Sequence, residues 1–133
     1  MIKFRAWDKD HKYMEYTDEN LVVCFSNEGT DVVDDTTFSH LCISMQNYEL
    51  MQSTGLKDKN GTEIYEGDIV ELKYPYDKRI KTKGSIVWDR YKSCFGISMK
   101  ETTERYELYR ITAENYLTVI GNKYQHPELL EDE

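Results

Sequence analysis

The segment STGLKDKNGTEIYEGDIVELKY (residues 53–74) constrains the fold more than any other stretch of the chain. Its first half is rich in turn residues. Asn60-Gly61 is a turn dipeptide, and Gly67 permits backbone angles that a Cβ would forbid. Asp68 follows, at a position where its carboxylate can accept hydrogen bonds from nearby amides. This half therefore predicts two tight turns in quick succession.

The second half of the segment is a strand with one apolar and one mostly charged face. Val70 and Leu72 alternate with three residues of the opposite face, Ile69, Glu71 and Lys73. Such short strands recur along the chain, and no stretch between them is long enough for crossover helices. The sequence therefore predicts a mainly β fold: an N-terminal β region (residues 1–52) packed on a C-terminal SH3-like small β-barrel (residues 53–133), with one or two short helical turns.

Further strands are expected on both sides of this segment. IKFRAW (2–7) alternates as a half-buried strand does, and YMEY (13–16) returns from it to form a hairpin. Other expected strands are LVVCF (21–25), GSIVWD (84–89), SCFGISM (93–99), RYELYRI (105–111) and YLTVIGN (116–122). Pro127 begins one helical turn in HPELL. Residues 36–52 fit either a short helix or an irregular strand, since periodicity alone does not decide between them.

Charge and cysteine content narrow the functional classes. The chain has 17 Lys and Arg against 25 Asp and Glu, a net charge of -8 that disfavours non-specific binding to DNA or anionic membranes. Three widely spaced cysteines, Cys24, Cys42 and Cys94, predict reduced, buried thiols rather than a disulfide framework. No run has the length of a membrane span, and the first residues lack a signal-peptide core. We therefore expect a cytoplasmic protein.

Three blocks of the chain together resemble one known family. IKFRAWDKDHKYM, GLKDKNGTEIYEGDIVE and VIGNKYQHPELL occur in this order and are similar to the YopX protein family, found in phages and prophages of bacteria. The resemblance implies a mainly β protein that acts inside the host cell. It brings no catalytic mechanism that can be carried over residue by residue. His126 stands where a small polar residue is expected before PELL.

The patterns that suggest catalysis have simpler structural explanations. Asp58, Glu71 and Lys73 occur in the order of an Asp…Glu-x-Lys nuclease core, in which two carboxylates hold Mg²⁺. A turn and the charged face of a strand explain the same three residues. A zinc site would need ligands without the usual Cys-x2-Cys spacing, drawn from Cys24, His40, Cys42 and Cys94. We therefore predict no enzyme activity, no catalytic or metal-binding residues and no cofactor.

One binding hypothesis rests on a basic loop. Residues 73–83 contain five cations and one acid, and tyrosines alternate with the cations. Cations suit phosphates, and aromatic rings stack on unpaired bases, so this mixture suits single-stranded nucleic acid. The residues expected to bind nucleic acid or a partner are Lys73, Tyr74, Tyr76, Lys78, Arg79, Lys81, Lys83, Trp88 and Tyr91.

The preferred hypothesis is a non-catalytic protein-interaction module. Tyrosine-rich strand edges and exposed acids in residues 28–35 and 128–133 suit docking to a host or phage protein, or to copies of the chain itself. An acidic phage product of this kind would fit a surface that a host enzyme normally offers to DNA.

Overall fold

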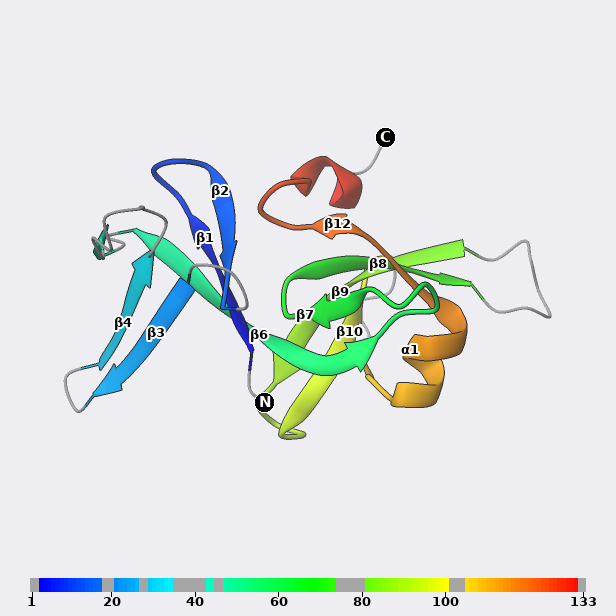
Figure 1. Cartoon of the computed structure of the whole chain (residues 1–133). Helices are drawn as coiled ribbons and strands as arrows, with labels where there is room; N and C mark the ends of the chain where they lie inside the picture. Colours follow the sequence, from blue (N-terminus) through cyan, green and yellow to red (C-terminus); the bar gives the residue numbers. More distant parts are fainter. Residues whose placement is uncertain are drawn as a thin grey trace. The chain divides into compact units, whose positions relative to one another are not determined.

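The computed structural model describes residues 3–17, 21–26, 29–34, 43–44, 47–73, 81–100 and 105–131. Within them the chain is mainly β, as predicted, with one short α-helix and one 3-10 turn (Figure 1). The chain divides into two compact units, residues 1–52 and 53–133. The helices among the described residues are too short and too polar to cross a membrane.

The larger sheet of the N-terminal unit contains an antiparallel hairpin. β1 (Phe4–Asp8) pairs with β2 (Tyr13–Tyr16) on one side and with the first half of β6 (Tyr48–Lys57) on the other. The hairpin prediction is therefore confirmed. The prediction of a half-buried first strand is wrong, because Arg5 and Trp7, on the face expected to be exposed, are both buried. Arg5 is only 3% exposed, so its whole side chain is enclosed by neighbours that the alternation of residue types does not show.

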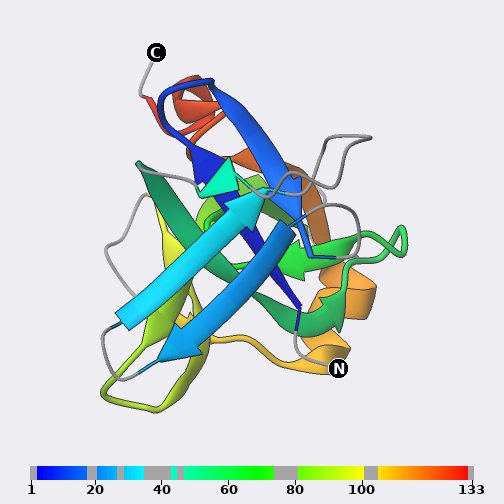
Figure 2. The same ribbon diagram turned by 60° about the vertical axis from the view of Figure 1, so that its left-hand side comes forward.

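A three-stranded sheet completes this unit. β3 (Leu21–Ser26) and β4 (Gly29–Asp34) form a hairpin, and β5 (Ile43–Ser44) pairs with β4 (Figure 2). Leu21 contributes to the small apolar core of the unit. Residues 36–52 fit a helix or a strand by sequence, and their described parts lie in β5, in β6 and in the bend before β6.

β6 continues across the division between the two units. Its second half pairs with β7 (Glu63–Tyr65), with a register shift between Ser53 and Lys57. Gly55 lies inside this shift at φ +78°, in the left-handed region that favours glycine. Thr54 Oγ1 donates a hydrogen bond of 2.7 Å to a carbonyl of β7. The strand therefore has a bulge just after the point where the units divide.

The C-terminal unit is built on a curled five-stranded sheet in the order β11-β10-β9-β8-β12. Its strands are β8 (Asp68–Lys73), β9 (Lys81–Asp89), β10 (Cys94–Met99), β11 (Arg105–Glu107) and β12 (Leu117–Asn122). All neighbouring pairs are antiparallel. The more specific assignment as an SH3-like barrel stays a prediction.

One face of this sheet, the inner face, carries the core of the unit. Its buried side chains include Val70, Leu72, Ile86, Ile97, Met99 and Leu117, which cluster with Ile64 of β7. Val70 and Leu72 were both predicted to share the apolar face. On the opposite, outer face, Ile69 is also buried, although the sequence places it among charged residues.

A short helix was missed by the sequence analysis. α1 (Arg110–Tyr116) begins inside residues 105–111, which were expected to be one strand, and only β11 there is extended. No side chain caps its start, and Ile111 and Thr112 are β-branched, so local propensity gives little signal. Ala113 is fully buried in the core, which indicates that tertiary packing selects the helix. The predicted turn at Pro127 is present as η1 (Pro127–Leu130).

Candidate functional site

Asp58 has a structural role that its position in a turn only partly suggests. Its carboxylate accepts hydrogen bonds from the N–H groups of Asn60 and Thr62 at Oδ1 and of Val119 at Oδ2, all at 2.9 Å. The residue is only 3% exposed. Gly61 completes the turn at φ +84°. Asp58 thus closes its own turn and also binds the edge of β12, 61 residues further along the chain.

The second predicted turn is equally structural. Gly67 has φ +87°, and the carboxylate of Asp68 accepts the N–H of Tyr65 at 2.7 Å. Asp58 and Asp68 are therefore both engaged by backbone N–H groups. Among the described residues, no group of three His, Cys, Asp or Glu side chains is placed to hold a metal ion.

The nuclease and zinc patterns gain no geometric support from this arrangement. The Asp58 oxygens receive backbone donors, while Glu71 lies opposite Lys83 in the β8–β9 ladder. His40 and Cys42 lie outside the described residues. Cys94 is a free, half-buried thiol.

The predicted binding residues fall into two groups at opposite ends of β9. Lys73 and Lys81 lie opposite each other where β8 ends and β9 begins, and Lys83 follows in β9. Trp88 lies near the other end of β9, about 23 Å from Lys81 at about 3.3 Å per residue. Tyr91 is in the turn that follows. Tyr74, Tyr76, Lys78 and Arg79 lie outside the described residues. The structure thus does not unite Trp88 and Tyr91 with the lysines.

The turn after β9 belongs instead to a cluster of exposed apolar side chains. We call this cluster the aromatic surface; it consists of Trp88, Tyr91, Tyr106, Tyr109 and Ile111. Trp88 is 48% exposed, Tyr91 82% and Ile111 73%. In the described part of the chain, these five are all of the large hydrophobic residues that are classed as exposed.

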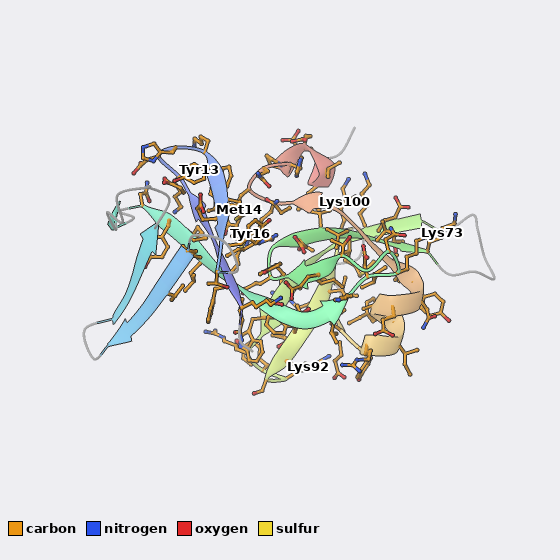
Figure 3. The ribbon with its side chains drawn as sticks, in the orientation of Figure 1. Tyr13, Met14, Tyr16, Lys73, Lys92 and Lys100 are labelled. Atoms are coloured by element: carbon orange, nitrogen blue, oxygen red, sulfur yellow. The ribbon has the colours of Figure 1, made fainter. Side chains whose placement is uncertain are left out.

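Two members of the aromatic surface contact neighbouring elements. Trp88 packs edge to face against Phe95 of β10, with ring centroids 5.0 Å apart. Lys92 Nζ, in the β9–β10 turn, lies 3.9 Å from a carboxylate oxygen of Glu107 in β11. The Tyr109 hydroxyl donates to the same carboxylate. Glu107 therefore links the turn, where Figure 3 labels Lys92, to Tyr109 just before α1. Trp88 and Tyr106, opposite Phe95 and Ile97 in the ladders, lie on the other face of the sheet from Glu107.

The turn itself is fixed by a buried acid. Asp89 Oδ1 accepts the N–H groups of Tyr91 at 3.0 Å and of Lys92 at 3.3 Å. Arg90 lies over the Tyr91 ring, 5.2 Å from its centroid, and donates to the Tyr91 hydroxyl. Ser93 then takes φ +54°, so the turn is tight. Tyr91 is thus highly exposed, and its backbone and ring are held by contacts with Asp89 and Arg90.

Cations border the aromatic surface although the whole chain is acidic. They are Arg90, Lys92, Arg105 and Arg110. Three described acids lie among them: the buried Asp89 of the turn, Glu107 beside Lys92, and Glu114, whose carboxylate is 4.0 Å from Arg110 Nε. The local composition is therefore aromatic and cationic. Sequence reasoning found Trp88 and Tyr91 but missed the other three members, because it placed 105–111 in one strand and had no measure of exposure.

These geometries can be compared with known proteins. The family model described as YopX protein matches residues 3–131. The chain belongs to the YopX protein family. A similar solved structure is protein EF1440 from Enterococcus faecalis, at 29% identity and a TM-score of 0.62, over 98% of this chain and 99% of that one. Another is protein yopX from Bacillus subtilis, at 23% identity and a TM-score of 0.69, over 97% and 98%, which shows the fold alone. No curated protein matches the chain.

In this YopX family member, the three blocks that resemble the family each contain a side chain that caps a turn. Asp8 does so in the first block and Asp58 in the second. In the third, Asn122 Oδ1 accepts the N–H groups of Tyr124 and Gln125 at 3.1 and 2.9 Å. His126, unexpected by sequence, accepts the Asn122 N–H at Nδ1 (3.3 Å). The blocks thus carry the fold, whereas the aromatic surface lies between the second and third.

In the Asp8 turn a pKa shift accompanies the capping. Asp8 Oδ1 accepts the N–H groups of Asp10 and His11, and Oδ2 lies 2.9 Å from His11 Nδ1. Burial raises the pKa of Asp8, but the hydrogen bonds of His11 and Asp10 and the charge of His11 outweigh it, so the net pKa is lowered. The ionised form of Asp8 is therefore favoured by folding.

We expect the stabilisation by Asp8 to be lost in acid. Because its folded pKa lies below the unfolded value of about 3.9, the contribution is present above that value and falls as pH drops through the folded pKa. Urea unfolding of the wild type and of Asp8→Asn, from about pH 6 to about pH 2, measures it. The difference between their free energies of unfolding should narrow toward the acid end; a constant difference would contradict the expectation.

Proposed function

We propose that this YopX family member is a non-catalytic protein-interaction module that binds a host or phage protein in the bacterial cytoplasm through the aromatic surface. The proposal rests on one observation: in the described part of the chain, the exposed large hydrophobic residues all gather between residues 88 and 111. Single exposed apolar residues are ordinary on soluble proteins, but several of them within one stretch of neighbouring elements favour an interaction site.

The composition of the aromatic surface supports a protein partner. Trp, Tyr and Arg are the residues most enriched at interfaces and at the positions that dominate binding energy. Here Trp88, Tyr91, Tyr106 and Tyr109 stand beside Arg90, Arg105 and Arg110. Aromatic side chains bury a large area on binding and lose little rotamer entropy, so a few of them suffice to anchor a partner.

The arrangement of the acids also favours binding over catalysis. Asp58, Asp68 and Asp89 accept backbone N–H groups, which is how a carboxylate stabilises a turn. Glu107 is shared between Lys92 and the Tyr109 hydroxyl. We therefore assign no catalytic role to these acids and place the function on the aromatic surface.

Loss of aromatic side chains should remove the partner. We expect Trp88→Ala/Tyr106→Ala, used as bait in a nuclease-treated lysate of the bacterial host, to capture the partner at least about tenfold less than wild type. Tyr91→Ala should act in the same direction and carries little risk to the fold, because that side chain makes few buried contacts. Gln52→Ala/Lys59→Ala, at exposed positions elsewhere, is the control. Mass spectrometry quantifies the captured protein.

Equal capture by the wild type and the aromatic variants would contradict the proposal. Fluorescence then gives a second readout with the purified partner. The chain has two tryptophans, and Trp7 is only 7% exposed, so a change of emission on binding reports Trp88. The Trp88→Phe variant should still bind the partner, but its tryptophan emission should not change on binding. A signal that persists in this variant would place the partner elsewhere.

A further inference from the structure

A second surface lies on the outer face of the five-stranded sheet, at the opposite end of β9 from the aromatic surface. Glu71 of β8 lies opposite Lys83 of β9, and the Lys83 carbonyl accepts the N–H of Lys100 just after β10. Lys73 lies two residues after Glu71 in β8, opposite the backbone of Lys81. Residues directly opposite in a ladder share a face, and residues two apart on a strand do so as well.

This register gathers cations. We call Lys73, Lys83 and Lys100 the lysine face; Figure 3 shows Lys73 and Lys100 along the upper side of the sheet, away from Lys92. In the rows that hold these lysines, the strands β8 to β10 supply one acid, Glu71. The sheet therefore keeps an unfavourable concentration of positive charge there.

The net charge of the chain does not cancel this local charge. Residues 1–52 carry four Lys and Arg against ten Asp and Glu, whereas residues 53–133 carry thirteen against fifteen. The acidic excess thus lies mainly in the N-terminal unit. At the ionic strength of a cell, charges more than about 8 Å apart are largely screened, so a ligand on the lysine face responds to the nearby lysines.

We propose that the lysine face binds the phosphates of single-stranded nucleic acid. Lysine ammonium groups are compact point charges that suit phosphate, and strands without sequence preference bind in positively charged tracks on β-sheets. The described face is a sheet surface without a helix or ribbon that would enter a duplex groove, which favours a single strand. Tyr74, Tyr76, Lys78 and Arg79 follow Lys73 in sequence and lie outside the described residues.

The proposal does not depend on the protein-interaction role of the aromatic surface. Lys100 Nζ also donates to the Glu131 carbonyl at 3.0 Å, so Lys73 and Lys83 are the better positions to test. Fluorescence anisotropy with a labelled thymidine oligonucleotide of about 20 nucleotides, at about 50 and about 200 mM salt, measures the affinity. The matched variants are Lys73→Glu/Lys83→Glu and Lys12→Glu/Lys59→Glu, which change the net charge equally.

We expect Lys73→Glu/Lys83→Glu to weaken binding at least about tenfold. The slope of log affinity against log salt concentration should flatten by about 1.4, since each of the two lost phosphate contacts contributes about 0.7. Lys12→Glu/Lys59→Glu should change affinity only about twofold, because net charge alone acts weakly. Lys73→Gln/Lys83→Gln, which avoids new acids in the sheet, should lie between wild type and the double glutamate variant, and its thermal unfolding checks the fold.

Three outcomes would overturn this inference: no binding by the wild type at low salt, equal loss in both double glutamate variants, or displacement by duplex of the same length as readily as by single strand. Trp88→Ala/Tyr106→Ala should leave oligonucleotide affinity unchanged. Because that variant is the one expected to lose the protein partner, the two proposals fail by separate measurements.

Discussion

Asp58→Ala should lower the free energy of unfolding of the C-terminal unit by about 3–5 kcal/mol. We expect this loss to be larger than that from replacing any other single acid discussed above. The substitution removes the acceptor for three backbone N–H groups, those of Asn60, Thr62 and Val119. Each donor left unsatisfied in a buried site costs about 1–3 kcal/mol. Urea unfolding followed by circular dichroism measures the loss, and amide exchange should speed up at Thr62 and Val119 first.

Asp58→Asn separates hydrogen bonding from charge. Its carbonyl oxygen can still accept the two N–H groups of the turn, but its amide nitrogen would then face the Val119 N–H, donor against donor. We therefore expect an intermediate loss of about 1–3 kcal/mol. Asp10→Ala removes the same charge at an exposed position and should cost less than about 0.5 kcal/mol. A similar small effect for Asp58→Ala would show that the link to β12 contributes nothing.

The parts of the fold that were predictable from sequence are those with a local cause. The hairpin of β1 and β2, the turns at Gly61 and Gly67 and the inward face of β8 follow from alternation and from residues that accept positive φ. Each depends on neighbours a few residues apart, which a single sequence displays directly.

The parts that escaped prediction have distant causes. α1 forms where Ala113 can enter the core, although its own residues resemble a strand. Arg5 is buried by its surroundings, which the strand pattern does not contain. Val119 meets Asp58 across 61 residues, so the main function of that acid was invisible in the turn motif alone.

The candidate sites were only half predictable for the same reason. Trp88 and the lysines at residues 73 and 83 were found by composition, but sequence proximity joined them into one site. Because an extended β9 separates them, they belong to two surfaces with different chemistry. The family blocks show the complementary pattern: Asp8, Asp58 and Asn122 serve turns, so the resemblance reports architecture, and function is to be sought in the segments between the blocks.

Gly84→Ala should destabilise the C-terminal unit by about 1–3 kcal/mol through overpacking. Gly84 lies on the inner face of β9, between Val70 and Met99 in the ladder. A Cβ there would meet Ile97 Cγ2 at 2.7 Å and the Ser98 carbonyl oxygen at 3.0 Å. The backbone carbonyl cannot rotate away, and Ile97 is enclosed by the core, so the sheet must open locally. Thermal unfolding of this variant measures the cost.

A double-mutant cycle with Ile97→Ala identifies the cause. Ile97→Ala alone should cost about 2–5 kcal/mol by leaving a cavity, but in that background the new methyl group at residue 84 enters the vacated space. The two losses should therefore combine to less than their sum, by about 1 kcal/mol or more. Ser85→Ala, on the outer face of the same strand, should show no such coupling with Ile97→Ala. If the losses of Gly84→Ala and Ile97→Ala simply add, the contact with Ile97 is not the cause. The contact with the Ser98 carbonyl oxygen, where β9 approaches β10 closely, would then set the requirement for glycine.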